Sequence, residues 1–120
     1  MNDVLDMAVV DELLSLSDDG DPELLLDLIR LFLDDGPTKV AAVTAGLAAR
    51  DFEQMERAAH SLNGSSGNLG ARHLQEACKQ MQMATRRRDF EASQQLAPRI
   101  ATEYAEVERA LLALRQRYAA

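Results

Sequence analysis

The last quarter of the chain carries an apolar stripe with the spacing of a long helix, and this pattern narrows the possible folds most. Seven apolar side chains recur at steps of 4, 4, 3, 4, 3 and 4 residues: Leu96, Ile100, Tyr104, Val107, Leu111, Leu114 and Tyr118. This heptad-like spacing is typical of a helix that packs antiparallel against others. Because no segment shows the sustained alternation of a half-buried strand, we predict an all-α fold.

Helical periods and junction residues divide the rest of the chain. Asp21–Pro22 combines an N-cap residue with a proline at the first helical position, which is a strong start signal. The junctions Arg50–Asp51 and Arg88–Asp89 resemble each other. We predict four helices before the long one: about Asp6 to Leu16, one that begins at Asp21–Pro22, about Phe52 to Gly67–Asn68, and about Ala71 to Thr85.

Two prolines leave alternatives open. Gly36–Pro37 makes the second segment either two helices or one kinked helix, and the continuing apolar register favours the kinked helix. Pro98 either kinks the last helix near its start or marks a later start. Because short connections make consecutive helices antiparallel, we expect an up-down antiparallel four-helix bundle with an additional short N-terminal helix. The bundle is expected to form a single domain over residues 1–120.

The charge balance disfavours some classes of function. A formal net charge of −7 disfavours nucleic-acid binding, because phosphate affinity comes largely from Lys and Arg. No apolar run approaches the roughly 20 residues of a membrane span, and the first residues lack the basic region of a secretory signal. We therefore expect a cytoplasmic protein without membrane insertion. The single cysteine, Cys78, occupies an apolar helical position and is expected to be a buried structural thiol.

A histidine and three glycines stand out in the stretch AAHSLNGSSGNLGA, residues 58–71. The predicted buried stripe of this helix consists of Phe52, Met55, Ala59, Leu62 and Ser66. At about 100° per residue, His60 lies about 130° from the middle of that stripe, so it is predicted to be exposed. Gly64 and Gly67 fall on the same outer side. They would leave bare backbone beside the imidazole, where a partner can approach closely.

An exposed imidazole beside bare backbone suits a carrier of a transferable group, because neutral imidazole is nucleophilic near neutral pH. The competing interpretation is an ordinary surface histidine, with glycines that permit close helix packing or mark a fraying end. Other chemistries fit less well. His60 and His73 lie on different predicted helices, and no cluster has metal-ligand spacing. The glycines do not follow a strand as in a nucleotide-binding loop. We expect neither a metal site nor a cofactor.

The same stretch resembles the signature of histidine-containing phosphotransfer (HPt) domains, which reads roughly A-H-x-L-K-G-S-S-x-x-L-G-A on one helix of a four-helix bundle. Residues 59–71 here read AHSLNGSSGNLGA, which matches nearly the whole motif. A looser resemblance spans almost the entire chain, including Asp21–Pro22–Glu23, the Gly36–Pro37 break and the junctions Arg50–Asp51–Phe52 and Arg88–Asp89–Phe90.

The resemblance implies roles for particular residues. His60 would accept a phosphoryl group from a receiver-domain aspartyl phosphate and pass it to another receiver, and Gly64 would clear space for the receiver. Gln82 occupies a position from which family members often hydrogen-bond the imidazole, and the alternative is a solvated polar residue. Asn63 stands where the family usually has lysine. Lys79, on the next helix, is a candidate source of the missing positive charge.

The expected partners are response-regulator receiver domains and a histidine kinase, including a hybrid kinase. The resemblance implies a phosphotransfer intermediate without independent turnover, in which Mg²⁺ belongs to the receiver rather than to this chain. We expect a monomer, either standing alone or excised from a hybrid histidine kinase. The alternative function is a non-catalytic helical adaptor that regulates a receiver or kinase by binding. A purely structural bundle would leave the exposed face of His60 and Gly64 unexplained.

Overall fold

The computed structural model describes residues 4–17 and 20–119, and no strand occurs within these ranges. Its helices are α1 (Met7–Ser15), α2 (Glu23–Ala49), α3 (Phe52–Asn68), α4 (Arg72–Arg86) and α5 (Phe90–Ala119). The all-α prediction is confirmed, and the predicted helix ends agree to within one or two residues. The polar residues 17–21 before α2 are predicted to form a turn, and residues 18 and 19 of this segment lie outside the described ranges.

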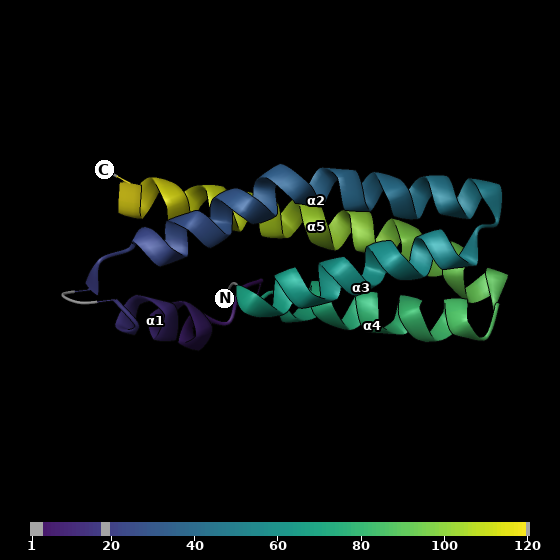
Figure 1. Cartoon of the computed structure of the whole chain (residues 1–120), viewed down its shortest axis with the longest axis horizontal. Coiled ribbons are helices and arrows are strands. Elements are labelled where there is room, and N and C mark those ends of the chain that lie inside the picture. Colours follow the sequence, from purple (N-terminus) through teal and green to yellow (C-terminus); the bar gives the residue numbers. More distant parts are fainter. Residues whose placement is uncertain (1–3, 18–19, 120) are drawn as a thin grey trace.

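Helices α2 to α5 form an antiparallel bundle, and the molecule as a whole is elongated, with extents of 48 × 23 × 22 Å (Figure 1). Each helix packs against two others: α2 and α4 both contact α3 and α5. In Figure 1, α2 and α5 run along the upper side and α3 and α4 along the lower side. This arrangement is the up-down four-helix bundle that the sequence predicts.

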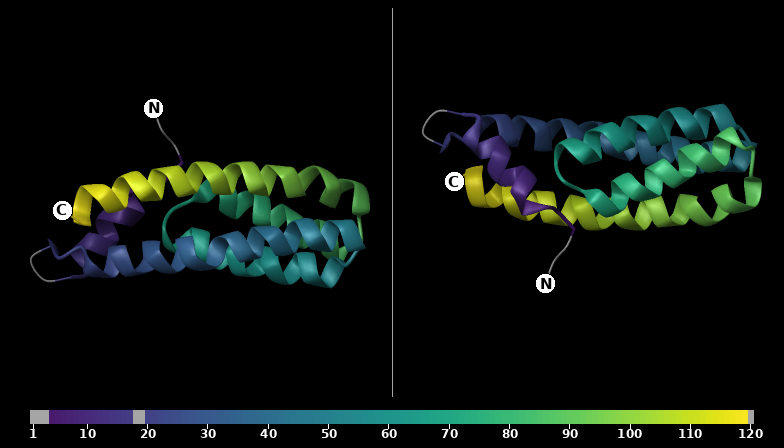
Figure 2. Two further views of the ribbon diagram at one scale, coloured as in Figure 1. Left: turned by 90° about the horizontal axis from the view of Figure 1, so that it is seen from above. Right: turned by 90° about the horizontal axis from the view of Figure 1, so that it is seen from below.

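Helix α1 is the additional N-terminal helix, and it lies beside the turn between α3 and α4 (Figure 2). Both α2 and α5 extend beyond that turn, and α1 lies between their projecting ends. The backbone N–H of Asp6 donates to the carbonyl of Gly70 at 2.8 Å. Arg72 donates from Nε to the Asp6 carboxylate at 2.7 Å, and this contact holds the pKa of Asp6 below its ordinary value.

Both proline-containing segments are continuous helices. Helix α2 runs through Pro37, so the two-helix alternative is wrong, and α5 runs from Phe90 through Pro98, which excludes a later start. Gly36 has a packing role, because a Cβ there would collide with the hydroxyl of Tyr104 on α5. The ring of Tyr104 stacks on Phe32 with centroids 5.2 Å apart. The glycine therefore allows α5 to approach α2 closely at this level.

The predicted stripe of α5 faces the core. Five of its residues are buried and the two at the ends, Leu96 and Tyr118, are partly buried against the core. Cys78 is also buried, as predicted, and burial raises the pKa of its thiol to about 12. Helices α2 and α5 are 27 and 30 residues long. Nevertheless, no helix within the described ranges is apolar enough to cross a membrane.

The two similar junctions, residues 50–52 and 88–90, also share a conformation. Arg50 and Arg88 both adopt a left-handed backbone with φ of 54°. Asp51 and Asp89 then cap the following helices, each accepting a backbone N–H at 3.0 Å. Left-handed backbone costs a non-glycine residue roughly 1–2 kcal/mol. Both arginines therefore occupy a conformation that glycine would adopt more readily.

The side chains of the two junctions contact each other's aromatic ring. The guanidinium of Arg50 lies 3.9 Å from the centroid of the Phe90 ring, and that of Arg88 lies 5.6 Å from the centroid of the Phe52 ring. A cation above an aromatic face contributes about 0.5–1 kcal/mol at an exposed site. The shorter contact offsets more of the backbone cost, so the two arginines are not equivalent.

We predict that Arg88→Gly raises the free energy of unfolding more than Arg50→Gly does. Both substitutions relieve the left-handed backbone, but Arg50→Gly also removes the closer cation–π contact, so the expected difference is about 0.5 kcal/mol. Urea unfolding followed by circular dichroism measures both variants against the parent chain. A larger gain for Arg50→Gly than for Arg88→Gly would contradict the assigned contacts.

Candidate functional site

His60 lies on the exposed side of α3, as the helical period predicts. The Asp51 side chain caps the start of this helix by accepting the backbone N–H of Gln54. The predicted buried stripe is also largely confirmed, since four of its members are buried and Phe52 is partly buried: Met55, Ala59, Leu62 and Ser66. The core-facing stripe therefore turns the imidazole outward.

The antiparallel pairing of α3 with α4 sets which residues lie beside His60. An ion pair joins Glu56 to Arg86 at 2.5 Å. One turn along each helix, His60 meets Gln82. Still further along, Gly67 faces Gln75. The same register holds over all three pairs, so α4 supplies the neighbours of His60 in a fixed order.

Gln82 is the residue that holds the imidazole. Its Nε2 lies 3.1 Å from Nδ1 of His60, and its Oε1 accepts a hydrogen bond from Nδ2 of Asn63 at 2.9 Å. Only 7% of Gln82 is exposed, so the alternative of a solvated polar residue is wrong. Within the described residues, Nε2 of His60 makes no hydrogen bond. The ring is therefore held at one nitrogen and open at the other.

Gly64 and Gly67 have different surroundings. A Cβ at Gly64 would meet nothing within 4 Å, so the surface one turn after His60 is open. A Cβ at Gly67 would lie 2.6 Å from Nε2 of Gln75 on α4. The expectation that Gly67 adds bare backbone beside the imidazole is therefore wrong. The amide end of the Gln75 side chain lies over Gly67, while Gly64 fits the predicted open approach.

Two exposed cations lie near His60 along the helices. Lys79 precedes Gln82 by one turn of α4, and the α3–α4 register places it level with Asn63. Arg57 precedes His60 by one turn of α3. Neither forms an ion pair with another described residue. No role for Arg57 was predicted from the sequence, although its three-residue spacing from His60 was the available signal.

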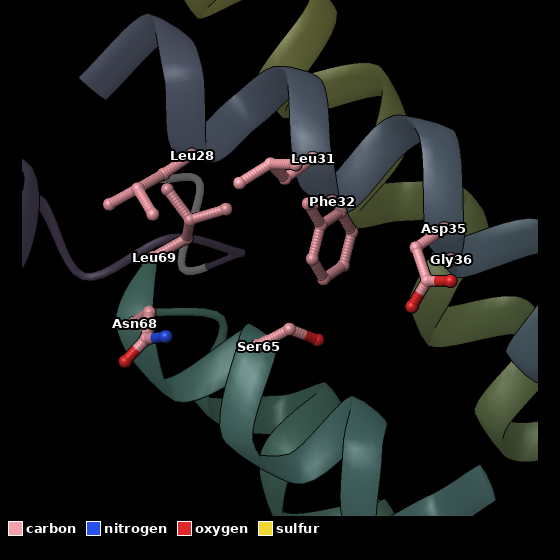
Figure 3. A pocket seen from close by; sticks show the side chains of 8 residues that line it. All are labelled: Leu28, Leu31, Phe32, Asp35, Gly36, Ser65, Asn68 and Leu69. Carbon is pink, nitrogen blue, oxygen red and sulfur yellow. The ribbon is translucent and has the colours of Figure 1, made fainter. Parts of the chain in front are cut away.

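An apolar groove borders this face between α2 and α3 (Figure 3). Its volume is about 400 Å³, and Leu28, Leu31 and Phe32 project into it from α2. Ser65, which follows Gly64, lines the α3 side. Leu31 is 55% exposed although it is a large apolar residue. Sequence reasoning missed the groove; the available signal was a surplus leucine outside the α2 core stripe.

Within the described residues, no group of three or more His, Cys, Asp or Glu side chains could hold a metal ion. His73 lies on the first turn of α4, away from the level of His60. An exposed imidazole with one nitrogen held and the other open can act as a nucleophile that carries a group.

Comparisons with known proteins agree with this chemistry. The family model described as Hpt domain matches residues 27–116. The structure of histidine-containing phosphotransfer protein B from Pseudomonas aeruginosa PAO1 superposes with a TM-score of 0.87 at 29% identity, covering 98% of this chain and 99% of that one. An HPT domain of a sensor hybrid histidine kinase from Shewanella shares the fold, with a TM-score of 0.79 at 22% identity over 98% and 97% of the two chains.

A plant relative extends the similarity beyond bacteria. Histidine-containing phosphotransfer protein 5 of Arabidopsis thaliana is 33% identical over 70 residues, covering 56% of this chain and 45% of the plant protein. The chain therefore spans about half the length of this plant relative.

Proposed function

Because the chain belongs to the Hpt domain family, we propose that it is a phosphorelay carrier in which His60 accepts a phosphoryl group from the aspartyl phosphate of a receiver domain and passes it to another receiver. The observation that carries this proposal is the exposed imidazole whose Nδ1 contacts Gln82 while Nε2 is open beside Gly64. A receiver of a hybrid histidine kinase is a suitable donor.

The transfer is a displacement at phosphorus. The lone pair on Nε2 of His60 forms the N–P bond while the P–O bond to the receiver's aspartate breaks, and the aspartate leaves as a carboxylate with that electron pair. This step requires the neutral ring with its proton on Nδ1, the nitrogen beside Gln82, and the ring gains a positive charge as the N–P bond forms. Transfer onward is the reverse displacement, with a carboxylate oxygen of the next receiver as the nucleophile.

The receiver supplies the remaining catalytic parts. Phosphoryl transfer depends on positioning and on stabilising charge that develops on the phosphoryl oxygens. In this proposal Mg²⁺ on the receiver performs that role, and the carrier has no independent turnover. The cations Lys79 and Arg57 add positive charge at the rim of the site. They take the place of the lysine that the family usually has at the position of Asn63. Water exclusion by the docked receiver strengthens their effect.

The receiver is proposed to dock over His60, Gly64 and the adjoining groove. Gly64 leaves the backbone accessible, so the receiver's active site can approach Nε2 closely. The exposed side chain of Leu31 offers apolar area to the same partner. His60, Asn63 and Gln82 all come from one chain, so a monomer contains the complete site.

We predict that His60→Gln abolishes acid-labile, alkali-stable labelling by a phosphorylated receiver and leaves the fold intact. A surface substitution usually changes stability by less than about 0.5 kcal/mol. Incubation with the phosphorylated receiver, followed by mapping of the label, measures the effect. The matched control is His73→Gln, which should be labelled like the parent chain.

Persistent labelling of the His60→Gln variant would assign the acceptor to another residue. Receiver binding without any label on the parent chain would instead favour the adaptor function over the carrier.

We predict that Gly64→Gln slows single-turnover transfer by at least about tenfold, equivalent to about 1.4 kcal/mol in the barrier. The larger side chain would fill the open surface through which the receiver reaches Nε2. Helicity should persist, because replacing a helical glycine removes a cost of up to about 1 kcal/mol. The control is Ala45→Gln at an exposed position of α2. Equal transfer rates for Gly64→Gln and the parent chain would refute a role for Gly64 in access.

A further inference from the structure

The contacts of Gln82 form a chain of hydrogen bonds with a direction. Asn63 donates from Nδ2 to Oε1 of Gln82, and Nε2 of Gln82 lies 3.1 Å from Nδ1 of His60. Each carboxamide has a donating end and an accepting end. The orientation of one amide therefore determines the orientation of the next, and the last amide determines whether Nδ1 accepts or donates.

Both hydrogen bonds, Asn63 to Gln82 and Gln82 to His60, can form in either of two directions. In the first, Gln82 donates to Nδ1, so the imidazole proton resides on Nε2 and the outward nitrogen has no free lone pair. In the second direction, the side-chain amide groups of Asn63 and Gln82 are each rotated by 180°, which exchanges the positions of their oxygen and nitrogen atoms. Nδ1–H then donates to Oε1 of Gln82, Nε2 of Gln82 donates to Oδ1 of Asn63, and Nε2 of His60 has a free lone pair. The two ends of an amide have nearly the same size, so both directions fit the same space.

We infer that Asn63 is a positioning residue that selects the tautomer of His60 through Gln82. The inference rests on the proposed function, because a phosphoryl group can be accepted only when the second direction leaves Nε2 of His60 with a free lone pair. Gln82 is 7% exposed as a whole residue, and the hydrogen-bond contacts at both ends of its amide are partly buried. Buried polar atoms are costly when unpaired, and this cost couples the orientation of Gln82 to that of Asn63.

The identity of residue 63 decides which directions are available. A carboxylate can only accept hydrogen bonds, so an aspartate at this position would hold the second direction. Asparagine can either donate or accept, so both directions are available to the hydrogen-bond chain that it forms with Gln82.

The test is the tautomer of His60 in the unphosphorylated protein, measured from the nitrogen-15 shifts of both ring nitrogens. The measurement is made at about pH 9, above the ordinary imidazole pKa of about 6.5. Asn63→Asp should raise the ratio of the Nδ1–H to the Nε2–H form several-fold over the parent chain. The matched control is Asn68→Asp, which adds the same charge to an exposed position of α3 and should leave the ratio unchanged.

A second background separates the hydrogen-bond chain from a direct effect of the new charge. In Gln82→Leu protein the hydrogen-bond chain between Asn63 and His60 is interrupted, so Asn63→Asp should no longer change the tautomer ratio. An unchanged ratio in Asn63→Asp alone, or an equal change with and without Gln82, would overturn the inference. Because this measurement uses no phosphate and no receiver, it can succeed or fail independently of the labelling test for His60.

Discussion

The antiparallel packing of α3 against α4 is the constraint on which the rest of the site depends. Small residues of both helices are buried, including Ala59 on α3 and Ala77 on α4. The end of the Gln75 side chain on α4 lies over Gly67 on α3. The resulting register brings Gln82 on α4 to His60 on α3. Functional groups on rigid helices are positioned more accurately than groups on loops, so the orientation of the imidazole follows directly from the packing.

The other helices support this pair and shape the surface around it. Helix α2 is continuous through Pro37, and the neighbouring Gly36 allows α5 to approach α2 closely. The same stretch of α2 presents Leu31 and Phe32 to the groove beside α3. In the proposed carrier, the nucleophile His60 therefore lies on the surface of the bundle and is not part of the hydrophobic core. Because the chemistry is divided between two proteins, the carrier needs an accessible nucleophile and a surface that its partner can cover.

Features that depend on one helix alone were predictable from the sequence, and features that depend on two helices were less so. The period of the apolar residues was enough to predict α3, its buried side and the exposure of His60. It could not separate Gly64 from Gly67, because the difference depends on the position of Gln75 on α4. The role of Gln82 remained one of two alternatives for the same reason. The contacts between the two arginine junctions also require knowledge of which helix ends meet.

The claim that Nε2 of His60 carries the phosphoryl group can be tested by direct observation of the bond. The protein is prepared with nitrogen-15 histidine, phosphorylated by its receiver and examined by NMR for coupling between phosphorus and a ring nitrogen. Because Nδ1 contacts Gln82 and Nε2 is open, one-bond coupling is expected at Nε2 of His60. Coupling at Nδ1 of His60, or only at His73, would contradict the proposed site.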